Sequence, residues 1–311
     1  MELGLIITSI ILNIVCLIFL QKYFIKKNKI ALVKARSSHN SIATNSGGVS
    51  LFLTIFLISS ALYLQGIEIF DYKILVPISL ITLIGIYDDI YEVDFKLKLL
   101  FQIITAKIII DQGFIINNLH GVLGIFELSS LYAQILTIFI IVAIINSINF
   151  IDGIDGLALA VLSTFIISFE FFSINFSAFD KLSLVLISAS IPMWYFNYRK
   201  RNKIFLGDAG SLMIGSIISI YVISILSNNY LIQDKYDVNK MVYVISILLY
   251  PIVDIIRVFF LRLSKGISPF IADKNHIHHL LLNKLIHHYK VVIIITLINI
   301  IFIIFVQRLF N

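Results

Sequence analysis

Long runs of apolar residues alternate with short polar segments along the whole chain. Ten apolar stretches stand out, at approximately residues 4–21, 47–64, 74–87, 97–116, 131–147, 157–175, 182–197, 211–227, 241–260 and 291–307. A helix needs about 20 apolar residues to cross ~30 Å of hydrocarbon. The pattern therefore predicts an all-α, polytopic integral membrane protein with about ten transmembrane helices.

The composition agrees with that expectation. Of the 311 residues, 59% are hydrophobic and 14% are charged, and the mean hydropathy is +0.99, outside the usual range of soluble globular domains. We find no internal repeat or soluble domain, so we predict one membrane-embedded domain over residues 1–311. The single cysteine, Cys16, lies in the first apolar stretch, which excludes an intrachain disulfide and argues against thiol catalysis.

Positive charge predicts the orientation. The segment "KYFIKKNK" follows the first apolar stretch, which therefore resembles a retained span more than a cleaved signal peptide. Placing that segment in the cytoplasm puts the loops with most Lys and Arg on the same side, namely 22–46, 88–96, 148–156, 198–210 and 261–290. Both termini are then expected outside the cytoplasm. The net charge of +6 reflects this topology and anionic headgroups, and no nucleic-acid partner is expected.

A pair of carboxylates, Asp88 and Asp89, closes the third apolar stretch. Two negative charges at a helix C-terminus repel each other and the helix dipole, and a divalent cation or a basic group would relieve that repulsion. An ordinary pair of surface aspartates at a helix end is the alternative. Asp94 is interpreted as a solvated loop charge.

The segment "NSINFIDGIDG" (146–156) links the fifth and sixth stretches. Asp152 and Asp155 are three residues apart, so they share a face if a helix begins nearby, and the glycine after each lets backbone approach a ligand. Asn146 and Asn149 extend the same polar face. The alternatives are helix capping by Asp155 and an interfacial position for the asparagines.

The segment "FLGDAGS" opens the eighth stretch at its cytoplasmic end. The free N–H groups of a helix N-terminus make a ready phosphate site, and an aspartate there could also hold Mg²⁺. The alternative for Asp208 is an ordinary N-cap. Four basic residues just upstream are candidates for substrate phosphate or for topological charge: Arg199, Lys200, Arg201 and Lys203.

Three close histidines, His276, His278 and His279, follow Asp273 and Lys274 in a cytoplasmic loop. Such a group invites a zinc hypothesis. The spacing fits no standard zinc pattern, however, and the other clusters are rich in Asp and Asn, which suit Mg²⁺. Histidines that hydrogen-bond a diphosphate or a lipid phosphate are therefore the preferred interpretation.

Some ionisable residues fall outside these clusters. Lys107 and Asp111 are four apart within an apolar stretch, so we predict a mutual pair. Asp254 and Arg257 stay open between pairing and function. His287 and His288 are interpreted as interfacial.

The order of these motifs resembles that of the polyprenyl-phosphate N-acetylhexosamine-1-phosphate transferases of glycosyltransferase family 4, most closely the bacterial WecA and TagO type. The family's paired aspartates are similar to Asp88 and Asp89, its Asn-x-x-Asn-x-x-Asp-Gly-x-Asp-Gly-Leu motif to residues 146–157, and its Gly-Asp-x-Gly-Ser motif to residues 207–211. The ninth-span Pro-x-x-Asp and the His-x-His-His loop resemble residues 251–254 and 276–279.

The resemblance implies a reaction and a location. A UDP-N-acetylhexosamine, with GlcNAc as the first choice of sugar, would give its sugar 1-phosphate to undecaprenyl phosphate and release UMP. The enzyme would be Mg²⁺-dependent, with Mn²⁺ as the alternative ion. It would lie in the bacterial cytoplasmic membrane with its active site facing the cytoplasm, would start a lipid-linked envelope glycan, and could be a homodimer.

The resemblance also implies roles for individual residues. Asp208 would be a metal ligand, with Asp88 and Asp89 as further candidates. Asp88, Asp89, Asp152 and Asp155 would be the catalytic set, with Asp88 as the base or the orienter of the lipid phosphate. The substrate-binding set would be Asn146, Asn149, Asn197, Phe205, His276, His278 and His279; within it Asn197 and Phe205, together with Asp152, would hold the uridine, and the histidines would steady the diphosphate.

Two alternatives stay open at this stage. The muramoyl-pentapeptide branch, MraY, is similar in fold but typically carries three consecutive histidines, where this chain has Ile277. A membrane transporter is the alternative of another class, although its ionisable groups would be expected near the bilayer midplane of related halves. The identity of the amino sugar, a deoxy sugar included, is open.

Overall fold

A computed structural model describes residues 2–27, 43–67, 70–174, 178–227, 239–266 and 275–309. The helices are α1 (Glu2–Lys26), α2 (Gly47–Leu64), α3 (Leu75–Tyr91), α4 (Phe95–Asp111), α5 (Ser130–Ile151), α6 (Leu157–Phe172), α7 (Asp180–Tyr198), α8 (Gly207–Leu226), α9 (Lys240–Ile247), α10 (Leu249–Ser264), α11 (Ile277–Leu285) and α12 (His288–Leu309). Short elements complete the list: strands β1 (Ala43–Thr44) and β2 (Lys203–Ile204), and single 3₁₀ turns η1 (Tyr72–Ile74) and η2 (Val122–Gly124).

Six of these segments are long and apolar enough to cross a membrane, namely α1, α2, Tyr72–Tyr91, α5, α8 and α12, and the bent pair α9–α10 makes a seventh if it counts as one span. The prediction of an all-α, multi-pass membrane protein is confirmed. The other predicted stretches, around 97–116, 157–175 and 182–197, form α4, α6 and α7. The total of ten spans and the position of the termini stay predictions.

The chain divides into two compact units. The first unit comprises Met1–Phe101 and Ala178–Met213, and the second comprises Gln102–Ser177 and Ile214–Asn311. Two of the three boundaries fall inside α4 and α8, and the third lies between α6 and α7. Each unit is described below by itself.

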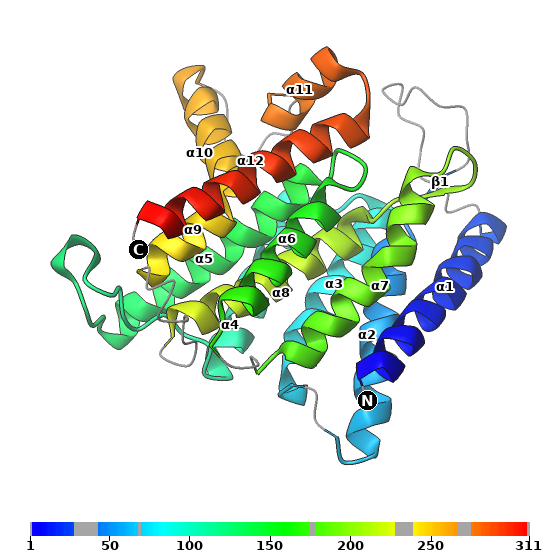
Figure 1. Cartoon of the computed structure of the whole chain (residues 1–311), viewed down its shortest axis with the longest axis horizontal. Coiled ribbons are helices and arrows are strands. Elements are labelled where there is room, and N and C mark those ends of the chain that lie inside the picture. Colours follow the sequence, from blue (N-terminus) through cyan, green and yellow to red (C-terminus); the bar gives the residue numbers. More distant parts are fainter. Residues whose placement is uncertain are drawn as a thin grey trace. The chain divides into compact units, whose positions relative to one another are not determined.

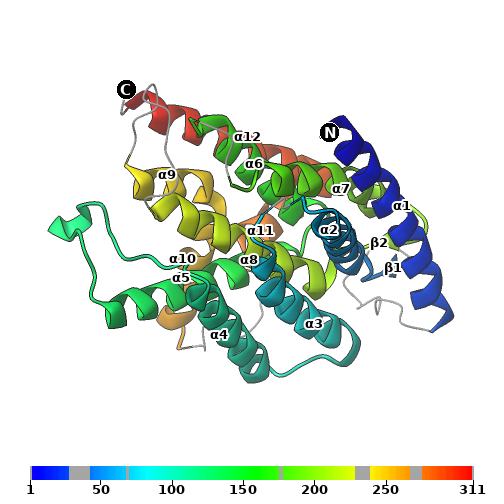
Figure 2. The same cartoon turned by 90° about the horizontal axis from the view of Figure 1, so that it is seen from below.

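In the first unit, α1 packs along α7 and α2 (Figures 1 and 2). A buried polar group ties the first two helices together, since Asn13 Nδ2 donates to Ser50 Oγ at 3.1 Å and to Thr54 Oγ1 at 3.2 Å. Side-chain hydrogen bonds of this kind hold helices together in a bilayer, where apolar contact alone gives little preference for protein over lipid.

A short parallel pairing brings the start of α2 beside the start of α8. β1 and β2 pair in the register Ala43 to Lys203 and Thr44 to Ile204. The two helix starts then approach so closely that a Cβ on Gly48 would lie 2.1 Å from the Gly210 nitrogen. Gly85 of α3 is equally close to α8, because its Cβ would lie 2.6 Å from Ala209 Cα. Glycine therefore allows three helix backbones to meet where the polar residues gather.

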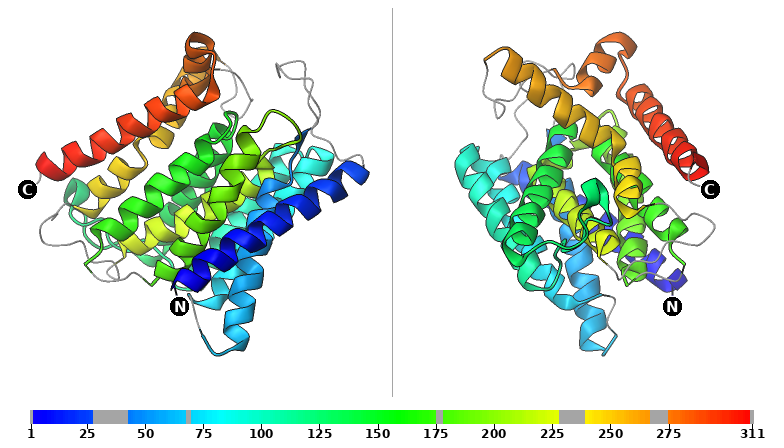
Figure 3. Two further views of the ribbon diagram at one scale, coloured as in Figure 1. Left: turned by 45° about the vertical axis from the view of Figure 1, so that its right-hand side comes forward. Right: turned by 90° about the vertical axis from the view of Figure 1, so that its left-hand side faces the viewer.

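In the second unit, α12 packs against α9, α6 and α11 (Figure 1). The ninth apolar stretch is broken, since α9 and α10 meet at 79° (Figure 3). Pro251, near the start of α10, has no N–H to give to the carbonyl of Ile247, four residues earlier. Asn299 of α12 supplies that donor instead, with Nδ2 3.1 Å from the Ile247 oxygen. Pro251 thus explains the break in the helix, and Asn299 provides the hydrogen bond that the Ile247 carbonyl would otherwise lack.

Candidate active site

A carboxylate cluster lies in the first unit, and we define it as Asp88, Asp89, Lys98 and Asp208. The Lys98 ammonium forms an ion pair with Asp88 Oδ2 and lies 3.5 Å from Asp208 Oδ2. Asp88 is only 7% exposed and its other oxygen accepts the Val93 N–H at 2.7 Å, whereas Asp208 is 34% exposed. Two of the predicted aspartates, which lie on the different helices α3 and α8, therefore share one cation.

Asp89 caps α8 from a distant part of the chain. Its carboxylate oxygens accept the backbone N–H groups of Asp208 at 3.1 Å and Ala209 at 3.0 Å, and Asn45 Nδ2 donates to Oδ1 at 2.8 Å. A carboxylate at this helix end is favourable because it meets the positive end of the dipole. The alternative of Asp208 as N-cap is wrong, because Asp208 lies in the first turn of α8, and two of the N–H groups at this helix end are bonded to Asp89. Phosphate binding at this helix end stays a prediction.

Lys98 is the residue of this cluster that the sequence did not single out. It lies in the first turn of α4, two residues after the exposed Lys96. A lysine at the end of an apolar stretch is usually a snorkelling residue, so its position carried no distinct signal. The structure separates the two lysines, because only Lys98 is ion-paired to the aspartates.

A histidine cluster lies in the second unit, and we define it as Tyr250, Asp254, His276, His278 and His279. Asp254 Oδ2 is 2.6 Å from His276 Nδ1, and Asp254 Oδ1 accepts the Ile277 N–H at 2.7 Å, which caps α11. Tyr250 Oη lies 2.8 Å from His278 Nδ1. The helix bend at Pro251 therefore carries both partners, Tyr250 and Asp254, that orient the histidines.

Burial sets the charge of one histidine. His278 is fully buried, and this desolvation, with the neighbouring imidazole of His279 as a smaller cause, lowers the pKa of His278 to about 3. His278 is therefore neutral at physiological pH. Its Nε2 has no hydrogen-bond partner among the described residues, so it is the open polar atom of the cluster.

The segment after α5 packs against these rings. A Cβ added to Gly153 would lie 3.2 Å from His279 Cε1 and 3.5 Å from His278 Nε2. Because Gly153 has no side chain, the segment 152–155 packs directly against the histidine rings. The sequence predicted two separate polar motifs here, and the structure makes them neighbours.

Asp155 is held by a histidine from another helix. His288 Nδ1, at the start of α12, lies 2.8 Å from Asp155 Oδ2 and 3.1 Å from the Asp155 backbone nitrogen. The interpretation of His288 as a merely interfacial residue is therefore wrong. Gly156, and not Asp155, is the N-cap residue of α6, and it has no side chain to contribute.

The predicted amide residues have protein partners. Asn146 and Gln102 exchange two side-chain hydrogen bonds, at 2.7 and 3.2 Å, and the backbone carbonyl of Asn149 accepts the Asp152 N–H at 3.4 Å. In the first unit, Asn197 is 3% exposed and donates to the Ile204 carbonyl at 2.9 Å. Their roles toward a substrate stay predictions.

The remaining candidates either contact other protein residues or lie outside the described residues. The Phe205 ring lies beneath the Lys203 ammonium, 5.3 Å from it. The predicted pair of Lys107 and Asp111 is confirmed. Arg257 donates to the Asn275 carbonyl and lies 3.8 Å from Asp254, so it belongs to the structural support of the histidine cluster. Asp273 and Lys274 lie outside the described residues.

Comparison with known proteins identifies the group to which this arrangement belongs. A model of the family described as Glycosyl transferase family 4 matches residues 72–226. The undecaprenyl-phosphate alpha-N-acetylglucosaminyl 1-phosphate transferase of Pasteurella multocida (strain Pm70) is 35% identical over 259 residues, which are 79% of this chain and 69% of that protein. The chain belongs to glycosyl transferase family 4.

Other relatives in glycosyl transferase family 4 carry similar names. The probable undecaprenyl-phosphate N-acetylglucosaminyl 1-phosphate transferase of Bacillus subtilis (strain 168) is 32% identical over 273 residues, 86% of this chain and 73% of that protein. The decaprenyl-phosphate N-acetylglucosaminephosphotransferase of Mycobacterium leprae (strain TN) is 28% identical over 297 residues, 86% and 73% of the two chains. The family match covers the carboxylate cluster and residues 146–156, but not the histidine cluster.

Both the histidine cluster and the carboxylate cluster contain side chains of the types that bind metal ions. Among the described residues, ligand atoms of Asp254, His276 and His278 all lie within 4.8 Å of one another. Two of these three are already hydrogen-bonded to each other, and Asp254 also caps a helix. The carboxylate cluster differs, because its oxygens already converge on a cation, and an all-oxygen donor set is the kind that Mg²⁺ prefers. The residues of the carboxylate cluster therefore fit Mg²⁺ better than those of the histidine cluster do.

Proposed function

We propose that this protein transfers N-acetylglucosamine 1-phosphate from UDP-N-acetylglucosamine to undecaprenyl phosphate and releases UMP. The observation that carries the proposal is the convergence of Asp88 and Asp208 on one cation, in a chain whose curated relatives are named for this transfer. The names of the three relatives described above all specify N-acetylglucosamine, which favours this sugar over the muramoyl-pentapeptide donor.

The chemistry is an exchange of one phosphorus–oxygen bond for another. A phosphate oxygen of the lipid forms a bond to the sugar-bearing phosphorus of the nucleotide sugar. The bond from that phosphorus to the bridging oxygen breaks, and its electron pair leaves with UMP. Both reactants are anions, so neutralising charge matters more than removing a proton from the acceptor.

Lys98, Asp88 and Asp208 are suited to that task. A bound Mg²⁺, held by Asp208 with Asp88 or Asp89 as a second ligand, would supply a Lewis acid for the diphosphate. Lys98 holds the two carboxylates together and contributes its own positive charge to an anionic ligand. Asp88 is paired and largely buried, which suits it to orienting a phosphate group better than to collecting a proton.

Asp89 has a supporting role in this proposal. It fixes the start of α8, and with it the backbone that carries Asp208, through two accepted hydrogen bonds. An aspartate whose oxygens are used in this way is a weaker metal ligand than Asp208, which is one-third exposed. Substitution of Asp89 should therefore act through the position of Asp208.

In the second unit, the histidine cluster and the Asp152–Asp155 segment would bind the nucleotide sugar. Neutral His278 offers a nitrogen to a ligand without adding positive charge, and His279 packs beside it with ring centroids 4.3 Å apart. Asp155 is fixed by His288, so the segment is held in place before a ligand arrives. Asn197 and Phe205 are proposed to hold the uridine, as the family resemblance implies.

The proposed location follows from the donor. Nucleotide sugars are made in the cytoplasm, so the polar motifs would face the cytoplasmic side of the bacterial inner membrane. The positive-inside distribution of Lys and Arg in the polar loops supports the same orientation. The lipid product would then be the starting point of an envelope glycan.

A donor panel tests the proposal. Membranes containing the protein are incubated with undecaprenyl phosphate and with UDP-GlcNAc, UDP-GalNAc or UDP-MurNAc-pentapeptide, each labelled in the sugar. We expect label in the lipid extract and UMP in the aqueous phase with UDP-GlcNAc. Label in lipid with only the pentapeptide donor would assign the muramoyl reaction, and uptake of a donor without lipid product would assign transport.

A further inference from the structure

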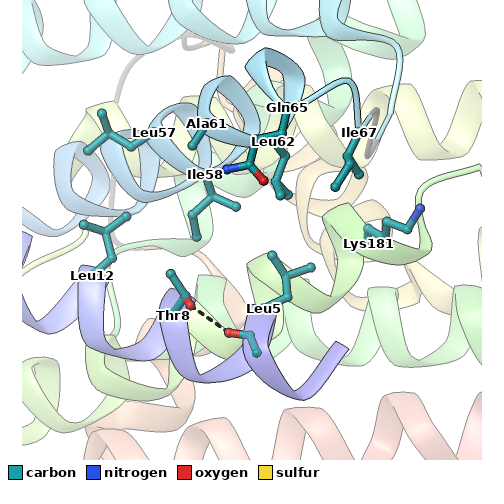
Figure 4. Close-up of a pocket in the computed structure, with 11 residues that line it drawn as sticks. Leu5, Thr8, Leu12, Leu57, Ile58, Ala61, Leu62, Gln65, Ile67 and Lys181 are labelled. Carbon is teal, nitrogen blue, oxygen red and sulfur yellow. Dashed lines mark hydrogen bonds between the residues drawn. The ribbon is translucent and has the colours of Figure 1, made fainter. Parts of the chain in front are cut away.

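An apolar pocket lies in the first unit, between α1, the end of α2 and the start of α7 (Figure 4). Its volume is about 570 Å³, within the range of small-molecule sites. Leucine and isoleucine side chains from α1 and α2 point into it, among them Leu5, Leu12, Ile58 and Leu62. The lining on α1 begins at Gly4, which leaves open space beside the backbone.

This pocket is remote from the carboxylate cluster. Asn45, which contacts Asp89, precedes the first residue of α2, whereas the pocket is lined by residues of its last turns, as far as Gln65. α2 has 18 residues, so its two ends are ~27 Å apart at 1.5 Å per residue. That distance is close to the thickness of the hydrocarbon core. The pocket therefore lies toward the end of α2 that is opposite to the carboxylate cluster.

One cation stands at the edge of the pocket. Lys181, in the first turn of α7, lines it, and no carboxylate of the described residues lies within 4 Å of the Lys181 ammonium. The neighbouring Asp180 carboxylate accepts the backbone N–H of Lys181 at 2.7 Å. Thr8 satisfies its own hydroxyl by donating to the Gly4 carbonyl at 2.7 Å. The wall is thus apolar, and its edge carries a positive charge and the amide of Gln65 (Figure 4).

We propose that this pocket binds one anionic glycerophospholipid of the surrounding bilayer, with an acyl chain along α1 and α2 and its phosphate on Lys181. The apolar wall matches a hydrocarbon chain, and a lysine at the membrane surface attracts an anionic headgroup. The Gln65 amide can donate to an ester or headgroup oxygen. The lipid is a ligand distinct from the proposed acceptor of the reaction, since the pocket lies toward the other end of α2 from the carboxylate cluster.

Native mass spectrometry of the purified full-length protein tests this site. The protein is released from nanodiscs of phosphatidylglycerol or of phosphatidylcholine with the same acyl chains, and retained lipid is counted. Two variants probe the two halves of the site: Lys181→Gln removes the charge, and Ala61→Phe fills the pocket. Lys73→Gln and Leu64→Phe are matched controls on the same unit, since neither residue lines the pocket.

We expect the wild type and both controls to retain one phosphatidylglycerol in preference to phosphatidylcholine. Lys181→Gln should reduce that preference about fivefold, the effect of one lysine on an anionic lipid. Ala61→Phe should abolish retention of both lipids while UMP release continues. Equal phosphatidylglycerol retention in the wild type and both variants would overturn the proposal. So would a result in which added undecaprenyl phosphate, and no phospholipid, is the lipid lost in Ala61→Phe.

Discussion

At the scale of single residues, the same side chain type takes unlike roles in this protein. Asp88 pairs with a buried lysine, Asp89 caps a helix, Asp208 keeps a third of its surface exposed, and Asp254 both caps a helix and orients a histidine. Only the environment separates these aspartates. Lys98 is the residue on which most of the carboxylate cluster depends, because it offsets the charge of two of them.

Replacing Lys98 tests its part in the cluster. Lys98→Met leaves the buried Asp88 carboxylate without its partner, and breaking a buried ion pair costs about 3–5 kcal/mol. We expect a lower Tm of the purified protein and a loss of UMP release of at least about tenfold. Lys96→Met is the matched control, since Lys96 is exposed, and it should leave both measurements near the wild type.

The low pKa of His278 predicts a stability change with pH. Its pKa of about 3 in the folded protein lies below the value of ~6.5 in an unfolded chain. Below pH ~6.5 the unfolded chain therefore takes up a proton that the folded protein refuses, so stability falls as the pH drops from ~6.5 toward 3. Above ~6.5 this residue makes no pH-dependent contribution.

Thermal unfolding at a series of pH values checks that prediction. The wild type should lose Tm between pH 7 and pH 5, and His278→Gln should show a shallower decline, although its Tm at pH 7 is lower because the Tyr250 contact changes. His287→Gln, at an exposed position, should keep the wild-type slope. Parallel slopes for the wild type and His278→Gln would mean that His278 is not the group responsible.

A site residue could be predicted from the sequence only where its local sequence is unusual for a membrane protein. Acidic residues beside glycines in apolar surroundings identify Asp152 and Asp208 as candidates, and the pairing with Asp89 at the end of an apolar stretch identifies Asp88. Partners such as Lys98 and His288 look like ordinary membrane-edge residues in the sequence, and only tertiary contacts give them a role. The capping of α8 by Asp89 was equally hidden, since a cap supplied from another helix leaves no local pattern.

At the scale of elements, most helices follow directly from the apolar pattern. The stretch at 47–64 coincides with α2, and the other stretches each fall within one helix or overlap it closely. The ninth stretch is the exception, because Pro251 interrupts it and the two halves meet at 79°. The proline is visible in the sequence, but the packing of α12 against both α9 and α10 is not.

The bend makes a prediction for Asn299. Asn299→Leu removes the donor to the Ile247 carbonyl, which Pro251 cannot serve, and a buried unpaired carbonyl costs about 1–3 kcal/mol. The expected result is a lower Tm together with reduced UMP release, because α10 carries Tyr250 and Asp254 of the histidine cluster. Ile298→Leu, at a neighbouring exposed position of α12, is the control. An unchanged Tm in Asn299→Leu would show that the carbonyl has another partner.

At the scale of the whole molecule, composition alone indicated the class of protein, and the structure agrees that this is a helical, multi-pass membrane protein. The division into two compact units could not be read from the sequence, because two of its three boundaries fall inside α4 and α8, where no linker marks them. Each unit contributes one polar cluster, built from segments far apart in the chain. The proposed reaction needs both clusters intact, so substitutions in either unit should reduce the same activity.

The central claim is that a carboxylate-held cation assists the transfer of a whole sugar phosphate to a lipid phosphate. The most direct measurement uses UDP-GlcNAc with one label in the sugar and a second in the phosphate attached to it, incubated with undecaprenyl phosphate and membranes of the wild type, Asp208→Asn and Asp94→Asn. We expect both labels in the lipid at equal ratio, with UMP as the nucleotide product. Turnover should be normal in Asp94→Asn and should fall at least about a hundredfold in Asp208→Asn. Release of UDP with only the sugar label in the lipid, or equal turnover in the two variants, would contradict it.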